Sequence, residues 1–330
     1  GCGPSEKPKA PSRPNPFAHA STLPFQAPDF RNIRDSDYQP AIEEGMRRQM
    51  AEVLAIANQG AAPTFDNTIV ALEKSGRMLD RVLETFYAVV QANTNPTLDK
   101  VQTAEAPRLA AHQDAIFLNP KLFARVKALY EKRDSLKLDP EAAQVLKLYY
   151  QQFIHSGANL PAADQARLKE INKQDASLQA EFQQRLVAGT KDAALALGDK
   201  AALDGLSDGE IATAAHAAQE RGMKGGYLIA LQNTTQQPLL TDLADRDTRE
   251  KLFNKSWTRT ERGDGNDTRG IIQTLAVIRA EKAKLLGYPN YAAYVLYDQM
   301  AGTPEVVQKF IGALVPATRA KAAEEAKMIQ

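Results

Sequence analysis

The chain has 330 residues, with 41 Lys and Arg against 40 Asp and Glu, and a net charge of +1. This balance leaves no basic surface of the kind that attracts nucleic acid, so a nucleic-acid partner is not expected. Hydrophobic residues make up 43% and charged residues 25% of the chain, which is typical of a globular protein. No stretch approaches the roughly 18 apolar residues of a transmembrane helix.

The single cysteine, Cys2, follows Gly1 and precedes a proline-rich segment. A bacterial lipoprotein signal ends in a small residue followed by the cysteine that is lipidated. Cys2 is therefore the candidate lipidation site, and Gly3 suits sorting to the outer membrane. This predicts a periplasmic protein anchored by its lipid. The alternative is a cytoplasmic protein in which Cys2 is incidental and Gly1 is left over from cloning.

Residues 1–20 are predicted to form a flexible proline-rich tether. From Gly1 to Phe17 there are five prolines and one large apolar side chain. Such a segment buries too little apolar surface to offset the entropy lost on ordering. We expect the folded body to start near Leu23 and to occupy residues 21–330.

The spacing of apolar residues in the body is helical almost everywhere. An apolar stripe runs from Ile42 to Ala57, and Asp139-Pro140 reads as a helix start with Gly157 as its stop. Further helices are expected after Pro161, ending at Gly189, and after Thr303-Pro304. The last of these carries a stripe made of Val306, Val307, Phe310, Ile311 and Leu314.

Strand signals are rare, so the predicted fold class is mainly α, an irregular multi-helix body. Only Tyr227 to Leu231 reads as a strand, and Asp192 to Leu197 is ambiguous between strand and helix. At most a small β element near 227–231 is expected. Ala320 to Gln330 consists of strong helix formers without a stop signal, which suggests a chain that breaks off inside a helix.

No constellation of catalytic or metal-binding residues is visible. Zinc peptidases place two histidines four residues apart on one helix with a Glu between them. The histidines here are widely separated, and each is predicted to be a surface or packing residue: His19, His112, His155 and His216. Ser156 follows His155 but has no nucleophile-elbow motif around it. Catalytic and metal residues are therefore predicted as none, and the substrate-binding residues stay unknown.

Two polar segments carry weaker signals. Asp264, Asn266 and Asp267 hint at a calcium loop, but Arg269 and Leu275 stand where that loop needs Gly and Glu. A turn or helix cap is expected there instead.

The second segment is Asn233 to Pro238, which reads N-T-T-Q-Q-P after the predicted strand. It fits either an edge that binds an extended peptide by strand addition or a turn that caps the next helix.

Several stretches in fixed order resemble the thimet oligopeptidase-like zinc metallopeptidases, on the bacterial peptidyl-dipeptidase branch. They include N-T-T-Q-Q-P, D-R-D-T-R-E-K-L-F from Asp245 to Phe253, S-W-T-R from Ser256, N-D-T-R from Asn266 and I-R-A-E-K-A-K-L-L-G-Y from Ile278. The resemblance covers about residues 15–330 and corresponds to the N-terminal half of such enzymes.

The resemblance implies a helical clam-shell enzyme that removes dipeptides from the free C-terminus of short, unfolded peptides. One Zn²⁺, held by an H-E-x-x-H helix and a downstream Glu, activates water in this family. Here that motif is missing, so no ligand or catalytic residue carries over to any position of this chain. Residues 21–330 would then be the N-terminal helical part of the peptidase domain, apparently truncated at 330, with the C-terminal half as its partner.

Two hypotheses about function remain open at this point. The first is that the chain is the N-terminal part of a zinc peptidyl-dipeptidase and is inactive alone. The second is that it is a non-catalytic helical module that binds peptides.

Overall fold

The computed structural model describes residues 13–329, so Cys2 lies outside the described residues. The chain divides into two compact units. Unit 1 runs to Ala176 and resumes at Ile278, and unit 2 is Ser177–Val277. Among the described residues, one pair of short strands is the only regular structure that is not helical. The prediction of a mainly-α fold is confirmed.

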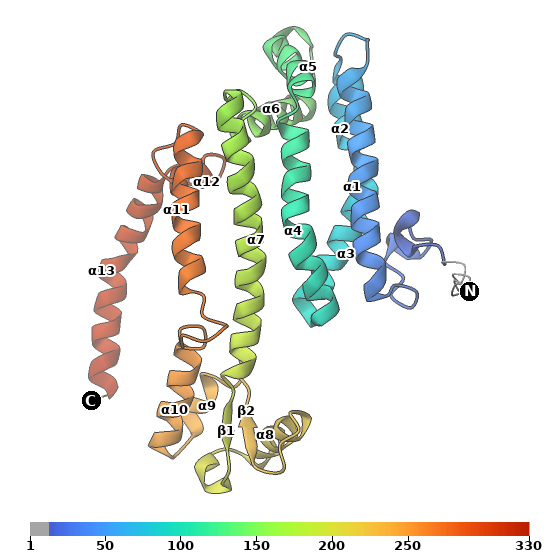
Figure 1. Ribbon diagram of the computed structural model, residues 1–330. Coiled ribbons are helices and arrows are strands. Elements are labelled where there is room, and N and C mark those ends of the chain that lie inside the picture. Colours follow the sequence, from blue (N-terminus) through green and yellow to red (C-terminus); the bar gives the residue numbers. More distant parts are fainter. Residues whose placement is uncertain (1–12, 330) are drawn as a thin grey trace, which may run out of the picture. The chain divides into compact units, whose positions relative to one another are not determined.

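Most helices lie entirely within unit 1 or entirely within unit 2, and two long helices belong partly to each (Figure 1). Helix α7 (Ala162–Asp192) starts in unit 1 and ends in unit 2, and α11 (Arg269–Leu285) returns from unit 2 to unit 1. The other helices of unit 1 are α1 (Asp35–Asn58), α2 (Ala71–Glu73), α3 (Arg77–Asn93), α4 (Pro96–Phe117), α5 (Pro120–Glu131), α6 (Pro140–His155), α12 (Tyr291–Leu296) and α13 (Pro304–Ile329).

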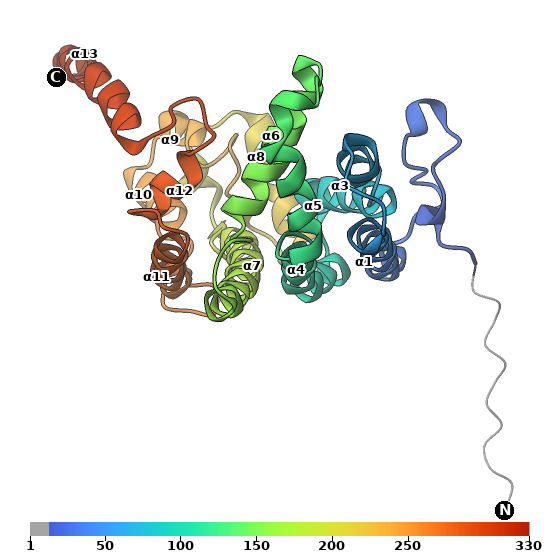
Figure 2. The same cartoon turned by 90° about the horizontal axis from the view of Figure 1, so that it is seen from above.

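Unit 1 is held together by apolar packing between neighbouring helices. Helices α1, α3 and α4 lie side by side (Figure 2) and share one buried cluster. A second cluster joins the end of α1 to α4, α5 and α6. Helices α1 and α3 approach closely at Gly45, where an added Cβ would lie 2.9 Å from the Cα of Leu79.

The packed part of unit 1 begins earlier than the sequence predicts. Phe17 lies in a short 3-10 helix, Pro16–Ala18, capped by the side chain of Asn15. Its ring is 5% exposed and lies 5.4 Å from the ring of Tyr38. The predicted tether boundary at residue 20 is therefore wrong for Phe17, because its ring packs on α1 and hydrogen bonds from Asn15 to α1 and from Arg81 of α3 hold the same segment.

Helix termini follow the predicted signals where those signals are local. Asp139 caps α6 by accepting a hydrogen bond from the backbone N–H of Ala142, and Gly157 has a φ of 90° after the end of this helix. The expected stop at Gly189 is wrong, because α7 continues to Asp192. Gly189 is buried, and a Cβ there would lie 2.8 Å from the carbonyl oxygen of Arg259. This glycine permits close packing within unit 2.

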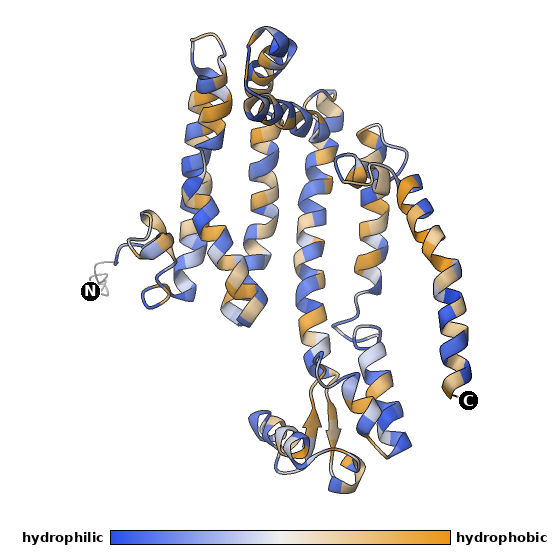
Figure 3. Cartoon of the chain, turned by 180° about the vertical axis from the view of Figure 1, so that it is seen from behind, coloured by the Kyte–Doolittle hydropathy of each residue, from blue (hydrophilic) through white to orange (hydrophobic). Residues whose placement is uncertain are grey.

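Unit 2 contains the two strands, β1 (Leu195–Leu197) and β2 (Tyr227–Ile229), paired antiparallel with Ala196 opposite Leu228. The predicted strand is confirmed in its first three residues, and the ambiguous Asp192 to Leu197 segment supplies its partner. Both strands are apolar (Figure 3) and pack into the core of this unit. The helices of unit 2 are α8 (Asp208–Glu220), α9 (Pro238–Asp242) and α10 (Arg246–Trp257).

Helix α13 carries the predicted apolar stripe, but the stripe is not buried. Phe310 is 67% and Leu314 53% exposed, and the first turns of this helix are strongly apolar (Figure 3). An exposed apolar surface of this kind is typical of an interaction site. The apolar stretch falls short of what a bilayer crossing needs, as do the helices in the rest of residues 13–329.

The contact at Gly45 generates a stability prediction. Gly45→Ala forces a methyl group against the backbone of α3, and we expect a loss of about 1–3 kcal/mol in the free energy of unfolding. Gly312→Ala is the matched control, because Gly312 is a helical glycine with nothing within 4 Å of an added Cβ. There the substitution should be neutral or stabilising by up to ~1 kcal/mol. Chemical denaturation checks both variants, and equal effects would contradict the close approach.

Candidate functional site

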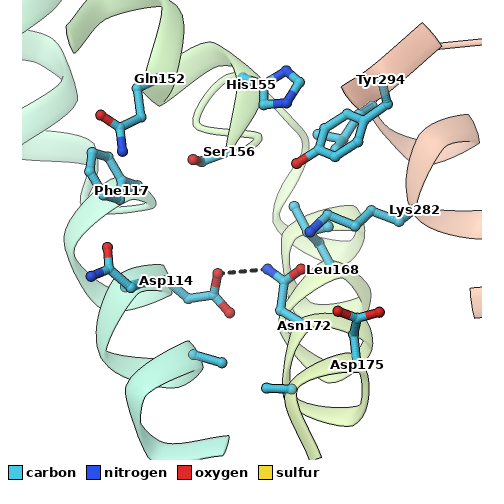
Figure 4. Close-up of a pocket in the computed structure, with 14 residues that line it drawn as sticks. Asp114, Phe117, Gln152, His155, Ser156, Leu168, Asn172, Asp175, Lys282 and Tyr294 are labelled. Carbon is cyan, nitrogen blue, oxygen red and sulfur yellow. Dashed lines mark hydrogen bonds between the residues drawn. The ribbon is translucent and has the colours of Figure 1, made fainter. Parts of the chain in front are cut away.

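A polar pocket of about 300 Å³ lies within unit 1, between α4, α6, α7, α11 and α12 (Figure 4). Its volume is at the lower end of the roughly 300–1,000 Å³ found for small-molecule sites. Side chains with hydrogen-bonding or ionisable groups line most of it: Gln113, Asp114, Gln152, His155, Ser156, Asn172, Asp175, Lys282 and Tyr294.

The long helix α7 contributes one face of the pocket. Leu168, Asn172 and Asp175 are spaced by four and three residues, which places them on the same side of a helix. All three line the pocket, as does Asp114 of α4 from the opposite side (Figure 4). The helical period of α7 thus brings two polar groups to the pocket, with Asn172 bound to α4 and Asp175 bound to Arg279 of α11.

Asp114 is a buried carboxylate with only one of its oxygens satisfied. It is 7% exposed, and its Oδ1 accepts a hydrogen bond of 2.7 Å from Nδ2 of Asn172. Its Oδ2 and the Oδ1 of Asn172 are buried and have no hydrogen-bond partner among the described residues. Burial raises the pKa of Asp114, and the bond from Asn172 and the charge of Lys282 oppose that rise.

Lys282 of α11 brings a positive charge to the same pocket. Its Nζ lies 5.3 Å from the ring centre of Tyr294, and burial lowers the pKa of its ammonium group. Asp175 and Asp114 oppose this effect through their charges. Asp175 itself accepts a 2.7 Å hydrogen bond from Arg279, so its charge is already paired.

His155 is enclosed by three tyrosines. Its ring stacks on Tyr294 at 4.0 Å and on Tyr297 at 3.8 Å between ring centres, and its Nδ1 lies 3.1 Å from the hydroxyl of Tyr288. Burial lowers the pKa of His155 to about 4, so the imidazole is neutral at pH 7. The result is an aromatic wall beside the charged groups of the pocket, in which His155 is stacked between two tyrosine rings.

Neither a nucleophile-base pair nor a metal site is arranged among the pocket residues that the structure describes. The hydrogen bond of His155 is to Tyr288 and not to the neighbouring Ser156, which gives no support to a nucleophile-base pair. Among residues 13–329, no group of three or more His, Cys, Asp or Glu side chains is arranged to hold a metal ion. The described residues therefore do not fit the zinc ion that the family resemblance implies.

The other histidines occupy surface or packing positions, as predicted. His19 is exposed, and His216 of α8 is exposed with its Nδ1 3.8 Å from Glu220. His112 is 8% exposed inside unit 1, with Nε2 2.6 Å from Oε1 of Gln49. Burial lowers the pKa of His112. The structure does not bring these three residues to the pocket.

The possible calcium loop is a turn that caps a helix. Asp267 accepts hydrogen bonds from the backbone N–H groups of Gly263 and Arg269 and pairs with the Arg269 side chain. These bonds lower the pKa of Asp267. The expectation of a turn or helix cap is confirmed.

The Asn233 to Pro238 segment forms a turn that leads directly into α9. The Thr235 hydroxyl donates to the carbonyl oxygen of Ala230 and accepts a 3.0 Å hydrogen bond from the N–H of Gln232. Gln236 accepts a 3.0 Å hydrogen bond from Ser256. These internal bonds agree with the turn interpretation.

Sequence reasoning missed Asp114, Asn172 and Lys282. A usable signal was present, because Asn172 and Asp175 follow Leu168 and Ile171 on a predicted helix at positions where the period places them near its apolar side. Polar residues at such positions need a partner when they are buried. The partner, Asp114, lies 58 residues away along the chain and cannot be found from local spacing.

The enclosure of His155 predicts a pH dependence of stability. The folded pKa of about 4 lies below the ordinary 6.5, so the unfolded chain takes up a proton first as the pH falls. This contribution to stability is complete above about pH 6.5 and is lost toward pH 4, by on the order of 2–3 kcal/mol. His155→Phe keeps an aromatic ring and should remove this component from denaturation curves measured between pH 7 and pH 4. The same change at exposed His216 is the control, and an unchanged pH profile for His155→Phe would refute the assignment.

Comparison with known proteins identifies relatives for nearly the whole chain. Residues 239–330 match the model of peptidase family M3. The chain is 48% identical over 316 residues to dipeptidyl carboxypeptidase of Escherichia coli, and 47% identical to the protein of that name from Salmonella typhimurium. Each match covers 96% of this chain and 46% of the relative.

More distant similarity extends to oligopeptidase A of Escherichia coli, at 23% identity over 92% of this chain and 45% of that protein. The chain thus spans slightly less than half the length of the curated relatives it matches. These matches confirm the resemblance predicted from the sequence motifs.

Proposed function

We propose that this chain is the N-terminal part of a zinc metallopeptidase that removes dipeptides from the C-terminal end of oligopeptides. The observation that carries the proposal is the 48% identity to a dipeptidyl carboxypeptidase over 96% of the chain. Its substrates are then short unfolded peptides with a free C-terminus. The ligands of the zinc ion and the residues of the activated-water mechanism lie outside these 330 residues in this proposal.

The exposed apolar surface of α13 supports the proposal that a further part of the enzyme packs against this chain. Val306, Phe310, Ile311 and Leu314 are between 50% and 67% exposed, and the relatives are about twice as long as this chain. We propose that the remaining C-terminal half of the enzyme covers this surface. Burial of these side chains would contribute favourably at about 25 cal/mol per Å² of apolar area.

We propose further that the protein is periplasmic and attached to the outer membrane through a lipid on Cys2. The support is the Gly1-Cys2 sequence followed by a proline-rich segment. A cytoplasmic location remains the competing proposal.

The proposed activity predicts a defined cleavage product. The natural protein that carries these 330 residues should release the C-terminal dipeptide from an N-acetylated tetrapeptide, and mass spectrometry of the products checks this. The same peptide with an amidated C-terminus is the control and should be cleaved at least tenfold more slowly, since it lacks the terminal carboxylate. A zinc chelator should abolish the cleavage, and added Zn²⁺ should restore it.

The 330-residue chain alone should show no such cleavage. Chelator-sensitive cleavage by this chain would contradict the assignment of the zinc ligands to other residues. If the natural protein has a mass near 36.1 kDa apart from any lipid and cleaves nothing, the peptide-binding module is the better interpretation.

The lipid proposal is tested at Cys2. In bacterial cells that produce the natural protein, Cys2→Ser should shift it from the membrane fraction to the soluble fraction, because one acyl-bearing residue provides the anchor. Quantitative immunoblotting of the two fractions measures the shift, and Ser5→Ala is the control for a change in the same segment. Retention of the Cys2→Ser protein at the membrane would disprove the lipid anchor.

A further inference from the structure

We propose that the pocket of unit 1 binds a small zwitterion, with its ammonium group at Asp114 and Asn172 and its carboxylate at Lys282. The identification of this zwitterion with a dipeptide, the product of the reaction, rests on the proposed function. The binding itself depends only on the pocket.

The acceptor side of the pocket is incomplete without a donor. Asp114 is more than nine-tenths buried and lines the pocket, yet its Oδ2 has no hydrogen-bond partner among the described residues. The Oδ1 of Asn172 is in the same condition. A buried acceptor without a partner costs about 1–3 kcal/mol, and more when it is charged. An ammonium group, with three donors, can satisfy both oxygens at once.

The donor side is Lys282. Within residues 13–329 its ammonium group makes no ion pair and lies over the ring of Tyr294. It faces the same pocket as Asp114, and the two side chains lie on opposite helices (Figure 4). The third charge of the pocket, Asp175, accepts a hydrogen bond from Arg279, and its negative charge also favours the charged form of Lys282.

This charge arrangement selects against simpler ligands. A lone cation at Asp114 is repelled by Lys282, and a lone anion at Lys282 is repelled by Asp114. A molecule with an ammonium group at one end and a carboxylate at the other meets a complementary charge at both ends. Free α-amino acids and unblocked dipeptides have this chemistry, and a volume of about 300 Å³ suits small ones.

The aromatic wall completes the site. The stacked rings of His155 and Tyr294 line the pocket next to Lys282, and His155 is neutral at pH 7. The ring faces pack on one another, so the uncharged ring edges of this stack are what can contact a peptide group or an apolar side chain without adding a charge. This property favours a dipeptide over a strongly polar ion.

Isothermal titration calorimetry on the 330-residue chain with alanylalanine tests the proposal. We expect saturable binding that weakens at least about tenfold for N-acetyl-alanylalanine, which lacks the ammonium group, and for alanylalanine amide, which lacks the carboxylate. Equal affinity for alanylalanine and both blocked forms would overturn the proposal, as would the absence of binding at millimolar concentration. A parallel titration with alanine distinguishes dipeptides from free amino acids as the ligand. Tighter binding of alanylalanine than of alanine assigns the site to dipeptides, and equal binding assigns it to amino acids.

Two variants locate the binding. Asp114→Asn keeps an oxygen for Asn172 and should weaken alanylalanine about tenfold while leaving the acetylated form unchanged. Lys282→Met should weaken the binding of alanylalanine about tenfold and leave the binding of alanylalanine amide unchanged. Lys284→Met, at an exposed lysine of the same helix, is the matched control. Circular dichroism verifies that each variant is folded. If a variant does not fold, the comparison of alanylalanine with its two blocked forms on the unaltered chain tests the proposal. Equal binding in both pocket variants would place the ligand elsewhere, whereas peptide cleavage by the natural protein tests the proposed function separately.

Discussion

Helices α4 and α7 meet at the hydrogen bond between the Asp114 carboxylate and the Asn172 amide, and the polar interior of unit 1 is arranged around it. Removing the Asn172 amide while the helices stay packed would leave a buried carboxylate with no hydrogen-bond partner, which costs far more than the loss of an exposed pair. On its other side α7 is joined to α11 by Arg167 with Glu281, at 2.5 Å, and by Asp175 with Arg279. The Arg167–Glu281 pair is exposed and contributes little, so three helices meet at one pocket mainly through Asp114 with Asn172 and Asp175 with Arg279.

The parts of the fold that follow from local chemistry could be predicted from the sequence. Asp139 and Gly157 mark the ends of α6 because capping needs only a side-chain oxygen at one end and a left-handed backbone at the other. Local signals predict the wrong tether boundary at Phe17 and the wrong helix end at Gly189, because the roles of these two residues depend on distant parts of the chain. A lone aromatic residue in a proline-rich segment does not indicate that it packs against Tyr38. A glycine near the end of a helix is typical of a stop signal, and only the structure shows that Gly189 makes room for the backbone of Arg259.

The candidate site was much less accessible to sequence reasoning. Helical periodicity shows that Asn172 and Asp175 lie on the same side of α7, but it does not show that Asp114 of α4 or Lys282 of α11 faces them. Family motifs were more informative about ancestry than about this pocket, because the motif of the zinc site does not occur in these residues. Chemistry that depends on residues from four or five helices becomes visible only when their packing is known.

Unit 2 is one continuous stretch, Ser177–Val277, inserted into the sequence of unit 1. During synthesis, unit 2 therefore leaves the ribosome complete while unit 1 still waits for the second half of α11 and for α12 and α13. Lys282 and Tyr294 reach the pocket last, so the pocket is incomplete until they arrive. An inserted unit that folds early keeps the two ends of the gap in unit 1 from drifting apart, which reduces the entropy cost of closing that long loop.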